Sequence, residues 1–304
     1  MSRNRLPNSR AVRAACSLAL LLLAATAAYS SGLERSVVIM PSGVDIGLLS
    51  PSGLWYDDLR GYLVVANPLL HQVSVLDRKG QIVKVLGKRG DLRFPRAVAA
   101  SRDGTLYIAG RESETLKIMK EYDSVAGEEY RSFDLAPQRR SAAIQPVALH
   151  VDGSGNLYVA DRGNRQGLVF GGDEKLKFFI PDVGEPADLW VDRSGKICVA
   201  DPGFGGVRVY DDRRKYLRTL GSQSSQFREP LRAKALTVDQ RGHLWVLEEG
   251  GRGIKAIDSL GNLLFSMGGE GFLSPADLAV DPQNNLYVLE EGGNRISVFS
   301  ITGF

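Results

Sequence analysis

One short strand phrase recurs six times along the chain, and its spacing constrains the fold more than any other feature. The clearest copies are Leu157–Asp161 and Ile197–Asp201. Looser copies are Leu63–Asn67, Leu106–Gly110, Leu244–Glu248 and Leu286–Glu290. The last residues of successive copies are 43, 51, 40, 47 and 42 positions apart. A repeat of roughly 40 to 50 residues built from short strands is typical of a β-propeller.

One complete repeat, residues 186–221, shows how a blade is built. It predicts strands over 186–192, 197–201, 207–210 and 216–220, separated by turns rich in Gly, Pro and Asp. The same frame fits copies that begin near Pro51, Pro95, Pro146, Pro186, Pro230 and Pro275. The copy at Pro230 carries an insertion of about three residues before its first strand resumes. The sequence therefore predicts an all-β, six-bladed propeller of four-stranded antiparallel blades.

The sixth repeat ends before a fourth strand can form. Ile296–Ile301 supplies its third strand, and the chain then stops at Phe304. A strand-like segment without a repeat of its own, Ser36–Met40, precedes the first blade. We expect this N-terminal strand to pair with the C-terminal blade and close the ring, because closure removes exposed sheet edges.

The first 30 residues differ from the rest. Four Arg residues, at positions 3, 5, 10 and 13, come before an apolar run over residues 14–28 and a small-x-small sequence at Ala25–Ala27. This layout predicts a signal peptide or, if it is not cleaved, an N-terminal membrane anchor over 1–30, with the propeller over 34–304. We therefore expect an exported protein, periplasmic or extracellular, that contacts a membrane only through an uncleaved N-terminus.

Removing the leader also removes the apparent basic character of the chain. The full sequence has 38 Lys and Arg against 35 Asp and Glu, but residues 31–304 have 34 against 35. Near-zero charge gives no electrostatic reason to expect nucleic acid as a partner. Cys198 is the only cysteine beyond the leader, so no intramolecular disulfide is expected, and its place in a repeat strand predicts a partly buried thiol.

Two segments carry a family resemblance. Asn156–Arg165 and Asn285–Phe299 resemble the NHL repeat. The resemblance covers essentially all of the chain after the leader, strongly in the third, fourth and sixth blades and weakly in the first and second. It implies a six-bladed propeller that serves as a binding platform. A minority of similar proteins are enzymes, among them peptidyl-hydroxyglycine lyases and calcium-dependent lactonases.

Metal-dependent catalysis requires convergent ligands, and the sequence offers few. His71 is predicted to open a third strand, His150 to lie in a first strand, and His243 to begin a second strand, so the three are not expected to meet on one ion. Residues 51–56 resemble the first blade of the lactonases, but residues 48–55 contain no carboxylate to bind calcium. We expect no metal and no cofactor, and calcium stays the alternative.

Charge is divided between the halves of one predicted rim, which carries the loops that enter first strands and the loops that join strands two and three. Basic residues gather in the first half and acidic residues in the second. Asp188 and Asp277 share one position, two after the blade Pro. Trp55, His150 and Trp190 share another, four after it, and either line the channel or pack between blades. The predicted binding residues are Asp188, Asp277, Trp190, His150, Trp55, Glu248, Glu290 and Arg96.

The function that these features predict is non-enzymatic. We expect a monomeric, exported propeller that presents rim loops to a protein, peptide or glycan partner. The alternative is a metal-dependent lactonase, another hydrolase or a lyase, with its site in the central channel. Solvated turns, whose acidic side chains bond to backbone N–H groups, remain an equally physical explanation of the rim charges.

Overall fold

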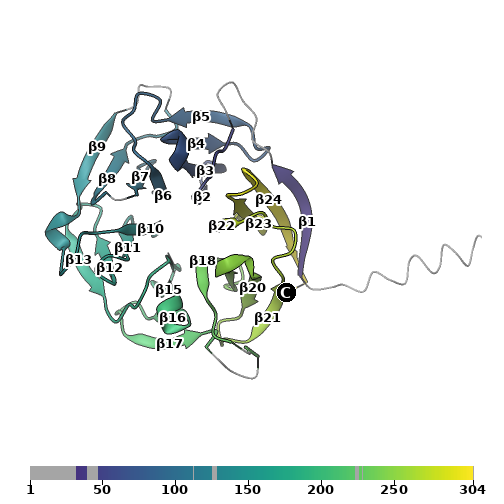
Figure 1. The fold of residues 1–304 in the computed structure, drawn as a ribbon. Coiled ribbons are helices and arrows are strands. Elements are labelled where there is room, and N and C mark those ends of the chain that lie inside the picture. The colour runs from purple at the N-terminus through teal and green to yellow at the C-terminus, as the bar shows by residue number, and fades with distance from the viewer. Residues whose placement is uncertain are drawn as a thin grey trace, which may run out of the picture.

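The chain folds into a closed ring of six antiparallel sheets around a central channel (Figure 1). The computed structural model describes residues 32–39, 47–111, 113–124, 129–222, 226–227 and 229–303. The predicted leader, residues 1–30, lies outside the described residues. Each sheet has four strands, as the repeat predicts. The six-bladed propeller is therefore confirmed.

In blades 1 to 5 the strands follow one another in chain order from the channel outward. Blade 1 contains β2 (Gly53–Asp57), β3 (Tyr62–Asn67), β4 (Gln72–Leu76) and β5 (Ile82–Leu86). Blade 2 contains β6 (Pro95–Ala100), β7 (Leu106–Gly110), β8 (Thr115–Met119) and β9 (Tyr130–Asp134). Blade 3 contains β10 (Pro146–Val151), β11 (Leu157–Asp161), β12 (Gln166–Phe170) and β13 (Leu176–Ile180).

The second half repeats this order. Blade 4 contains β14 (Asp188–Val191), β15 (Ile197–Asp201), β16 (Gly206–Tyr210) and β17 (Tyr216–Leu220). Blade 5 contains β18 (Ala233–Val238), β19 (Leu244–Glu248), β20 (Gly253–Ile257) and β21 (Leu263–Met267). Blade 6 contains β22 (Pro275–Val280), β23 (Asn285–Glu290), β24 (Arg295–Thr302) and β1 (Gly32–Ile39). Single 3₁₀ turns are η1 (Pro68–Leu70), η2 (Ala136–Gln138), η3 (Pro202–Phe204) and η4 (Glu249–Gly251).

The N-terminal strand closes the ring. β1 pairs antiparallel with β24 over its whole length, from Gly32 opposite Thr302 to Ile39 opposite Ile296. In Figure 1 it forms the outer edge of the C-terminal blade. The strand predicted over Ser36–Met40 is thus confirmed as the fourth strand of blade 6, and it begins four residues earlier than expected. Met40 itself lies outside the described residues.

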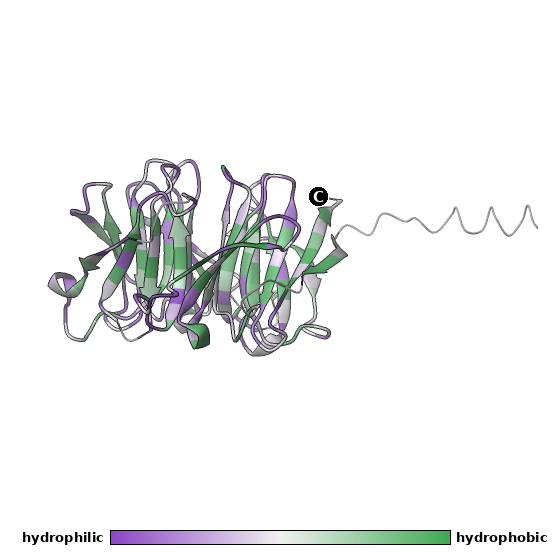
Figure 2. Cartoon of the chain, turned by 90° about the horizontal axis from the view of Figure 1, so that it is seen from above, coloured by the Kyte–Doolittle hydropathy of each residue, from purple (hydrophilic) through white to green (hydrophobic). Residues whose placement is uncertain are grey.

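The blades hold together through apolar faces that alternate along every strand. At the seam between blades 6 and 1, Ile39 packs with Leu48, Leu54, Leu289 and Ile296 in one buried cluster. Seen from the side, the molecule is flattened, with apolar residues along the strands and polar residues in the loops of both rims (Figure 2). No helix in the described ranges is long and apolar enough to span a membrane.

Blade 5 accounts for the 47-residue interval between the fourth and fifth repeats. Ala233 lies opposite Glu248, just as Pro275 lies opposite Glu290 in blade 6. Ala233 therefore takes the place of the blade proline, three residues after Pro230. The predicted insertion is confirmed, and it lengthens the connection into the blade without changing its register.

Substitution of Ile39 by Ala should weaken ring closure. Ile39 is 6 % exposed within the blade 6–blade 1 cluster, and Val37 in the same strand is 53 % exposed. We expect Ile39→Ala to lower the free energy of unfolding by about 2–4 kcal/mol in urea denaturation. Val37→Ala should change it by less than about 0.5 kcal/mol. Equal effects of the two variants would contradict a closing role for the buried face of β1.

Candidate functional site in the central channel

The first strand of every blade lines one continuous cavity along the ring axis. Its volume is about 1430 Å³, larger than the ~300–1,000 Å³ of ordinary ligand sites. Six of the eight predicted binding residues line it: Asp188, Asp277, Trp55, His150, Trp190 and Arg96. We name the rim that carries the loops entering first strands and the loops between second and third strands the front rim. The opposite rim is the back rim.

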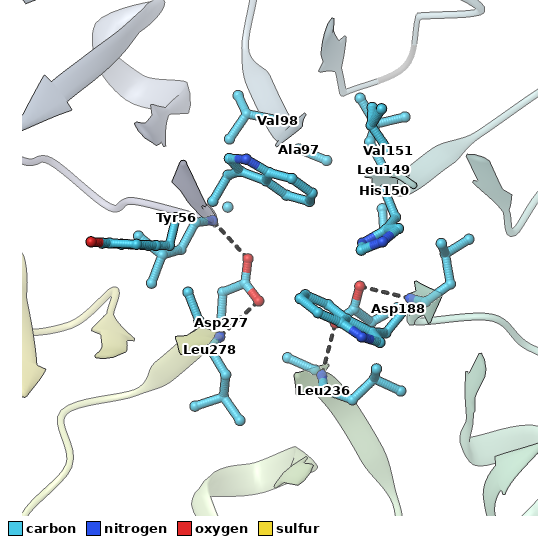
Figure 3. A pocket seen from close by; sticks show the side chains of 18 of the residues that line it. Tyr56, Ala97, Val98, Leu149, His150, Val151, Asp188, Leu236, Asp277 and Leu278 are labelled. Carbon is cyan, nitrogen blue, oxygen red and sulfur yellow. Dashed lines mark hydrogen bonds between the residues drawn. The ribbon is translucent and has the colours of Figure 1, made fainter. Parts of the chain in front are cut away.

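Asp277 and Asp188 join neighbouring blades on the channel wall. The Asp277 carboxylate accepts hydrogen bonds from the N–H groups of Leu278, in its own blade, and Leu54, in blade 1, at 2.8 and 2.7 Å. Asp188 accepts from Leu189 and from Leu236 of blade 5, at 2.7 and 2.8 Å. Figure 3 shows both carboxylates within the channel, each reaching to the next blade. These bonds give both aspartates a structural role in the ring.

The surroundings of the two carboxylates favour their protonated forms. Burial, followed by the negative charge of Asp277, raises the pKa of Asp188 well above its ordinary value, against the N–H bonds from Leu236 and Leu189. Burial raises the pKa of Asp277 to about 7, against the N–H bonds and the positive charge of Lys234. The negative charge of an ionised Asp277 thus opposes the ionisation of Asp188.

An aromatic cluster crosses the channel two residues further along the first strands, away from the front rim. The Trp55 ring of blade 1 meets the His150 ring of blade 3 edge-on, with ring centroids 5.3 Å apart. His150 in turn lies 4.6 Å from the Trp190 ring. Blade 2 places Ala99 at the same register position, which leaves room for Trp55 to reach past it. Burial lowers the pKa of His150 to about 4, so its imidazole is neutral at pH 7.

The sequence left open whether these three aromatic residues line the channel or pack between blades, and the structure shows both arrangements. Trp55, His150 and Trp190 line the cavity. Trp55 and Trp190 also pack against core clusters between blades. Their rings narrow the channel beyond the level of the aspartates.

Glu248 and Glu290 lie elsewhere and do not line the cavity. Both end second strands and are almost fully buried. Glu248 pairs with Lys255. Glu290 accepts hydrogen bonds from Arg295, Ser297 and the N–H of Leu273. Burial alone would raise the pKa of Glu290, but these bonds outweigh it and lower the pKa. Glu248 therefore joins β19 to β20, whereas Glu290 holds both β24 and the loop before β22.

The charges at the channel mouth are divided as the sequence indicates, with one addition. The residues that directly follow the second strands of blades 1 to 6 are Pro68, Arg111, Arg162, Pro202, Glu249 and Glu291. All except Pro202 line the cavity. Arg111 and Arg162 of blades 2 and 3 thus face Glu249 and Glu291 of blades 5 and 6 across the ring. Arg162 is not among the residues that the sequence predicts for this site, although it directly follows its strand phrase, as Arg111 does.

The histidines lie apart, as predicted. His71 precedes β4 and accepts a hydrogen bond from the Phe94 N–H at 3.1 Å. His243 precedes β19 and bonds to Asp239 at 3.0 Å, and His150 lies in β10. Within the described part of the chain, no group of three or more His, Cys, Asp or Glu side chains is placed to hold a metal ion. Cys198 is buried, which raises its pKa to about 12 and keeps the thiol protonated.

Comparisons with known proteins agree with the class of protein that this geometry defines, a β-propeller with a lined central channel. A family model described as NHL repeat matches residues 272–299, from the loop before β22 into β24. The chain is a six-bladed β-propeller, and its sixth blade contains a segment that matches the NHL repeat. No curated protein sequence matches it.

Solved structures similar to this chain have different activities. A virginiamycin B lyase from Staphylococcus aureus is 12 % identical, covers 90 % of this chain and 89 % of its own, and has a TM-score of 0.58. A gluconolactonase from Xanthomonas campestris is 16 % identical, with coverages of 84 % and 87 % and a TM-score of 0.64. The WD40 propeller domain of Doa1 is 11 % identical, with coverages of 90 % and 98 % and a TM-score of 0.59. At such identities these similarities show the fold alone.

The raised pKa of Asp277 predicts a pH-dependent stability. Between the ordinary value of 3.8 and about 7, the folded protein holds a proton that the unfolded chain has released. The free energy of unfolding therefore falls as pH rises through this window. In Asp277→Asn, which cannot ionise, the fall should be smaller by at least about 1 kcal/mol, measured by urea denaturation from pH 4 to 8.

Asp212→Asn, in the exposed β16–β17 turn, is the control. Its pH profile should match that of the wild type. Identical profiles for Asp277→Asn and the wild type would show that Asp277 ionises normally in the folded protein.

Proposed function

We propose that the protein is an exported, non-enzymatic binding propeller that takes a protein, peptide or glycan partner on its front rim. The observation that supports this most directly is the collection of exposed apolar side chains there. Front-rim loops contain five exposed large hydrophobic residues: Leu49, Leu69, Phe94, Phe204 and Leu273. In the described turns of the back rim, the exposed large hydrophobic residues are Leu59 and Leu260. An apolar surface beside charged groups suits a binding rim.

The chemistry of the channel also favours binding over catalysis. All four carboxylate oxygens of Asp188 and Asp277 already accept a backbone N–H. The His150 ring lies between two tryptophans. A rigid ring whose polar wall groups are largely occupied presents its mouth to a partner without needing to rearrange.

The alternative, a metal-dependent lactonase or lyase, is favoured by one feature. Two carboxylates with raised pKa values share an enclosed cavity with a histidine, an arrangement common at catalytic sites. Binding of an ion there would require at least one Asp to give up a bond that joins two blades.

Photo-crosslinking tests the binding rim. We would replace Leu69 or Phe94 on the front rim, or Leu260 on the back rim, with p-benzoylphenylalanine in cells that naturally produce the protein. All three side chains are exposed. Adducts from positions 69 and 94, but not from 260, are expected on denaturing gels. Adducts confined to position 260, or equal at all three positions, would place the partner elsewhere.

Metal analysis tests the alternative. We expect purified protein to contain no stoichiometric calcium or zinc, and its melting temperature to change by less than about 1 °C on adding either ion. Hydrolysis of gluconolactone should not exceed that of an Asp188→Asn/Asp277→Asn variant. A stoichiometric ion lost in that variant, together with turnover by the wild type, would favour the enzyme.

A further inference from the structure

The six first strands present one ring of equivalent backbone groups to the channel. Strand register places one residue of each blade at the level of the aspartates: Gly53, Ala97, Ala148, Asp188, Ala235 and Asp277. The residues that follow them are Leu54, Val98, Leu149, Leu189, Leu236 and Leu278. In an antiparallel strand, the N–H groups at one register position point the same way. The six N–H groups of this second set therefore face the channel.

Two aspartates satisfy four of these six groups. Asp277 bonds the N–H groups of Leu278 and Leu54, which spans the junction of blades 6 and 1. Asp188 bonds those of Leu189 and Leu236, which spans the junction of blades 4 and 5. Each carboxylate thus takes one N–H from its own blade and one from the next.

The third junction, between blades 2 and 3, has no carboxylate. Its N–H groups belong to Val98 and Leu149, and the residue before Val98 is Ala97. Figure 3 shows these three residues on the channel wall across from Asp277. Among the residues that the structure describes, no side-chain acceptor reaches either N–H. Val98 and Leu149 both line the cavity, so their N–H groups can donate to an acceptor that enters the channel.

Positive charge gathers at the same junction. Arg96 directly precedes Ala97 in β6, and Arg111 and Arg162 follow the second strands of blades 2 and 3. All three line the cavity. Burial, and then the charges of Arg162 and Arg111, lower the pKa of Arg96, as expected for clustered cations.

These arginines have little to bind within the protein. In the described ranges, the guanidinium groups of Arg96 and Arg111 make no hydrogen bond or ion pair. Arg162 reaches the Pro186 carbonyl at 3.4 Å. At the equivalent position in blade 5, by contrast, Lys234 donates to the Pro275 carbonyl at 2.7 Å. Guanidinium groups such as those of Arg96 and Arg111, on the same side of the channel as two N–H groups that lack a side-chain acceptor, are donors suited to an anion.

We propose that the junction of blades 2 and 3 binds the carboxylate of a ligand, in the position that an aspartate occupies at the other two junctions. This site rests on the proposed function, and it names the group of the partner that is recognised. The ligand oxygens accept the N–H groups of Val98 and Leu149, and Arg96, Arg111 and Arg162 balance the charge. The carboxylate belongs to a peptide C-terminus or to an acidic sugar, and the rest of the ligand lies towards Phe94 and Leu69, which also line the cavity.

Calorimetry with matched probes tests the recognised group. Acetyl-Gly-Gly-Leu with a free C-terminus and galacturonate represent the two sources, and the peptide amide and methyl galactoside are their neutral counterparts. We expect the free-acid peptide, galacturonate or both to bind. An acid that binds should do so about tenfold or more tightly than its neutral counterpart. Which acid binds distinguishes the two sources. Inorganic phosphate should bind more weakly than that acid. Equal binding of the acid and its neutral counterpart, or no binding of either acid, overturns the proposal.

Arginine variants test the location. Arg96→Gln and Arg162→Gln should each weaken binding of the acid by about tenfold, because each removes a charged donor. Lys234→Gln is the matched control, since Lys234 holds the equivalent position in blade 5, and it should leave affinity within about twofold. If all three variants lose affinity for the acid equally, the arginines act only through the overall positive charge of the channel. That result would overturn the proposed location of the site.

A built-in carboxylate provides a test that needs no ligand. In Ala97→Asp, the new side chain should bond Val98 and Leu149 as Asp188 and Asp277 bond their pairs. We therefore expect a higher melting temperature and loss of acid binding. The control, Ala235→Asp, places a carboxylate between Leu236 and Leu278, whose N–H groups are already bonded, and should lower the melting temperature. A similar fall of the melting temperature in Ala97→Asp and Ala235→Asp overturns the proposal. If the site fails while the front rim still crosslinks a partner, the binding function stands and only its carboxylate specificity is lost.

Discussion

The pairing of β1 with β24 is the interaction on which the rest of the structure depends. Without it, blade 6 would expose the edge of β24 and leave the apolar face of Ile39 without its neighbours in blade 1. Closure also fixes the position of β22 against β2, and only in a closed ring can Asp277 reach the N–H of Leu54, 223 residues away in the sequence. The geometry of the channel wall is thus a consequence of how the chain closes.

In the closed ring, the blades differ in whether they supply an acceptor to the N–H groups that face the channel. Six equivalent N–H groups face the channel, in pairs at the junctions of blades 6 and 1, 4 and 5, and 2 and 3. The chain supplies a carboxylate acceptor at the first two of these junctions. Ala97 at the third junction lies beside three arginines, whereas Asp188 and Asp277 occupy the other two. The asymmetry of charge and the missing acceptor therefore coincide on one side of the channel. Their coincidence is why we locate ligand recognition there rather than at the aspartates.

The sequence was sufficient to predict the architecture, because the repeat period and the alternation of apolar residues are local signals. It identified the closing strand from a segment that had no repeat of its own. Aligned copies also identified the shared positions of Asp188 with Asp277 and of Trp55 with His150 and Trp190. These positions follow from register, which the hydrophobic pattern determines.

Side-chain direction could not be predicted in the same way. Glu248 and Glu290 end the strand phrase and were expected at the mouth, yet they are buried and paired. The contact between Trp55 and His150 depends on the small Ala99 of the intervening blade, a three-dimensional relation with no sequence signature. Arg162 has no sequence signal of its own, because it comes close to Arg96 and Arg111 only when blades 2 and 3 lie side by side.

The most direct test of the account is the amide NMR spectrum of the deuterated protein during titration with the acidic probe. Hydrogen bonding to a carboxylate moves an amide proton downfield. We expect the signals of Val98 and Leu149 to move together in this direction, while those of Leu54 and Leu236, whose N–H groups are already bonded to aspartates, stay in place. Shifts confined to other residues, or no shift of Val98 and Leu149 at saturation, would contradict it.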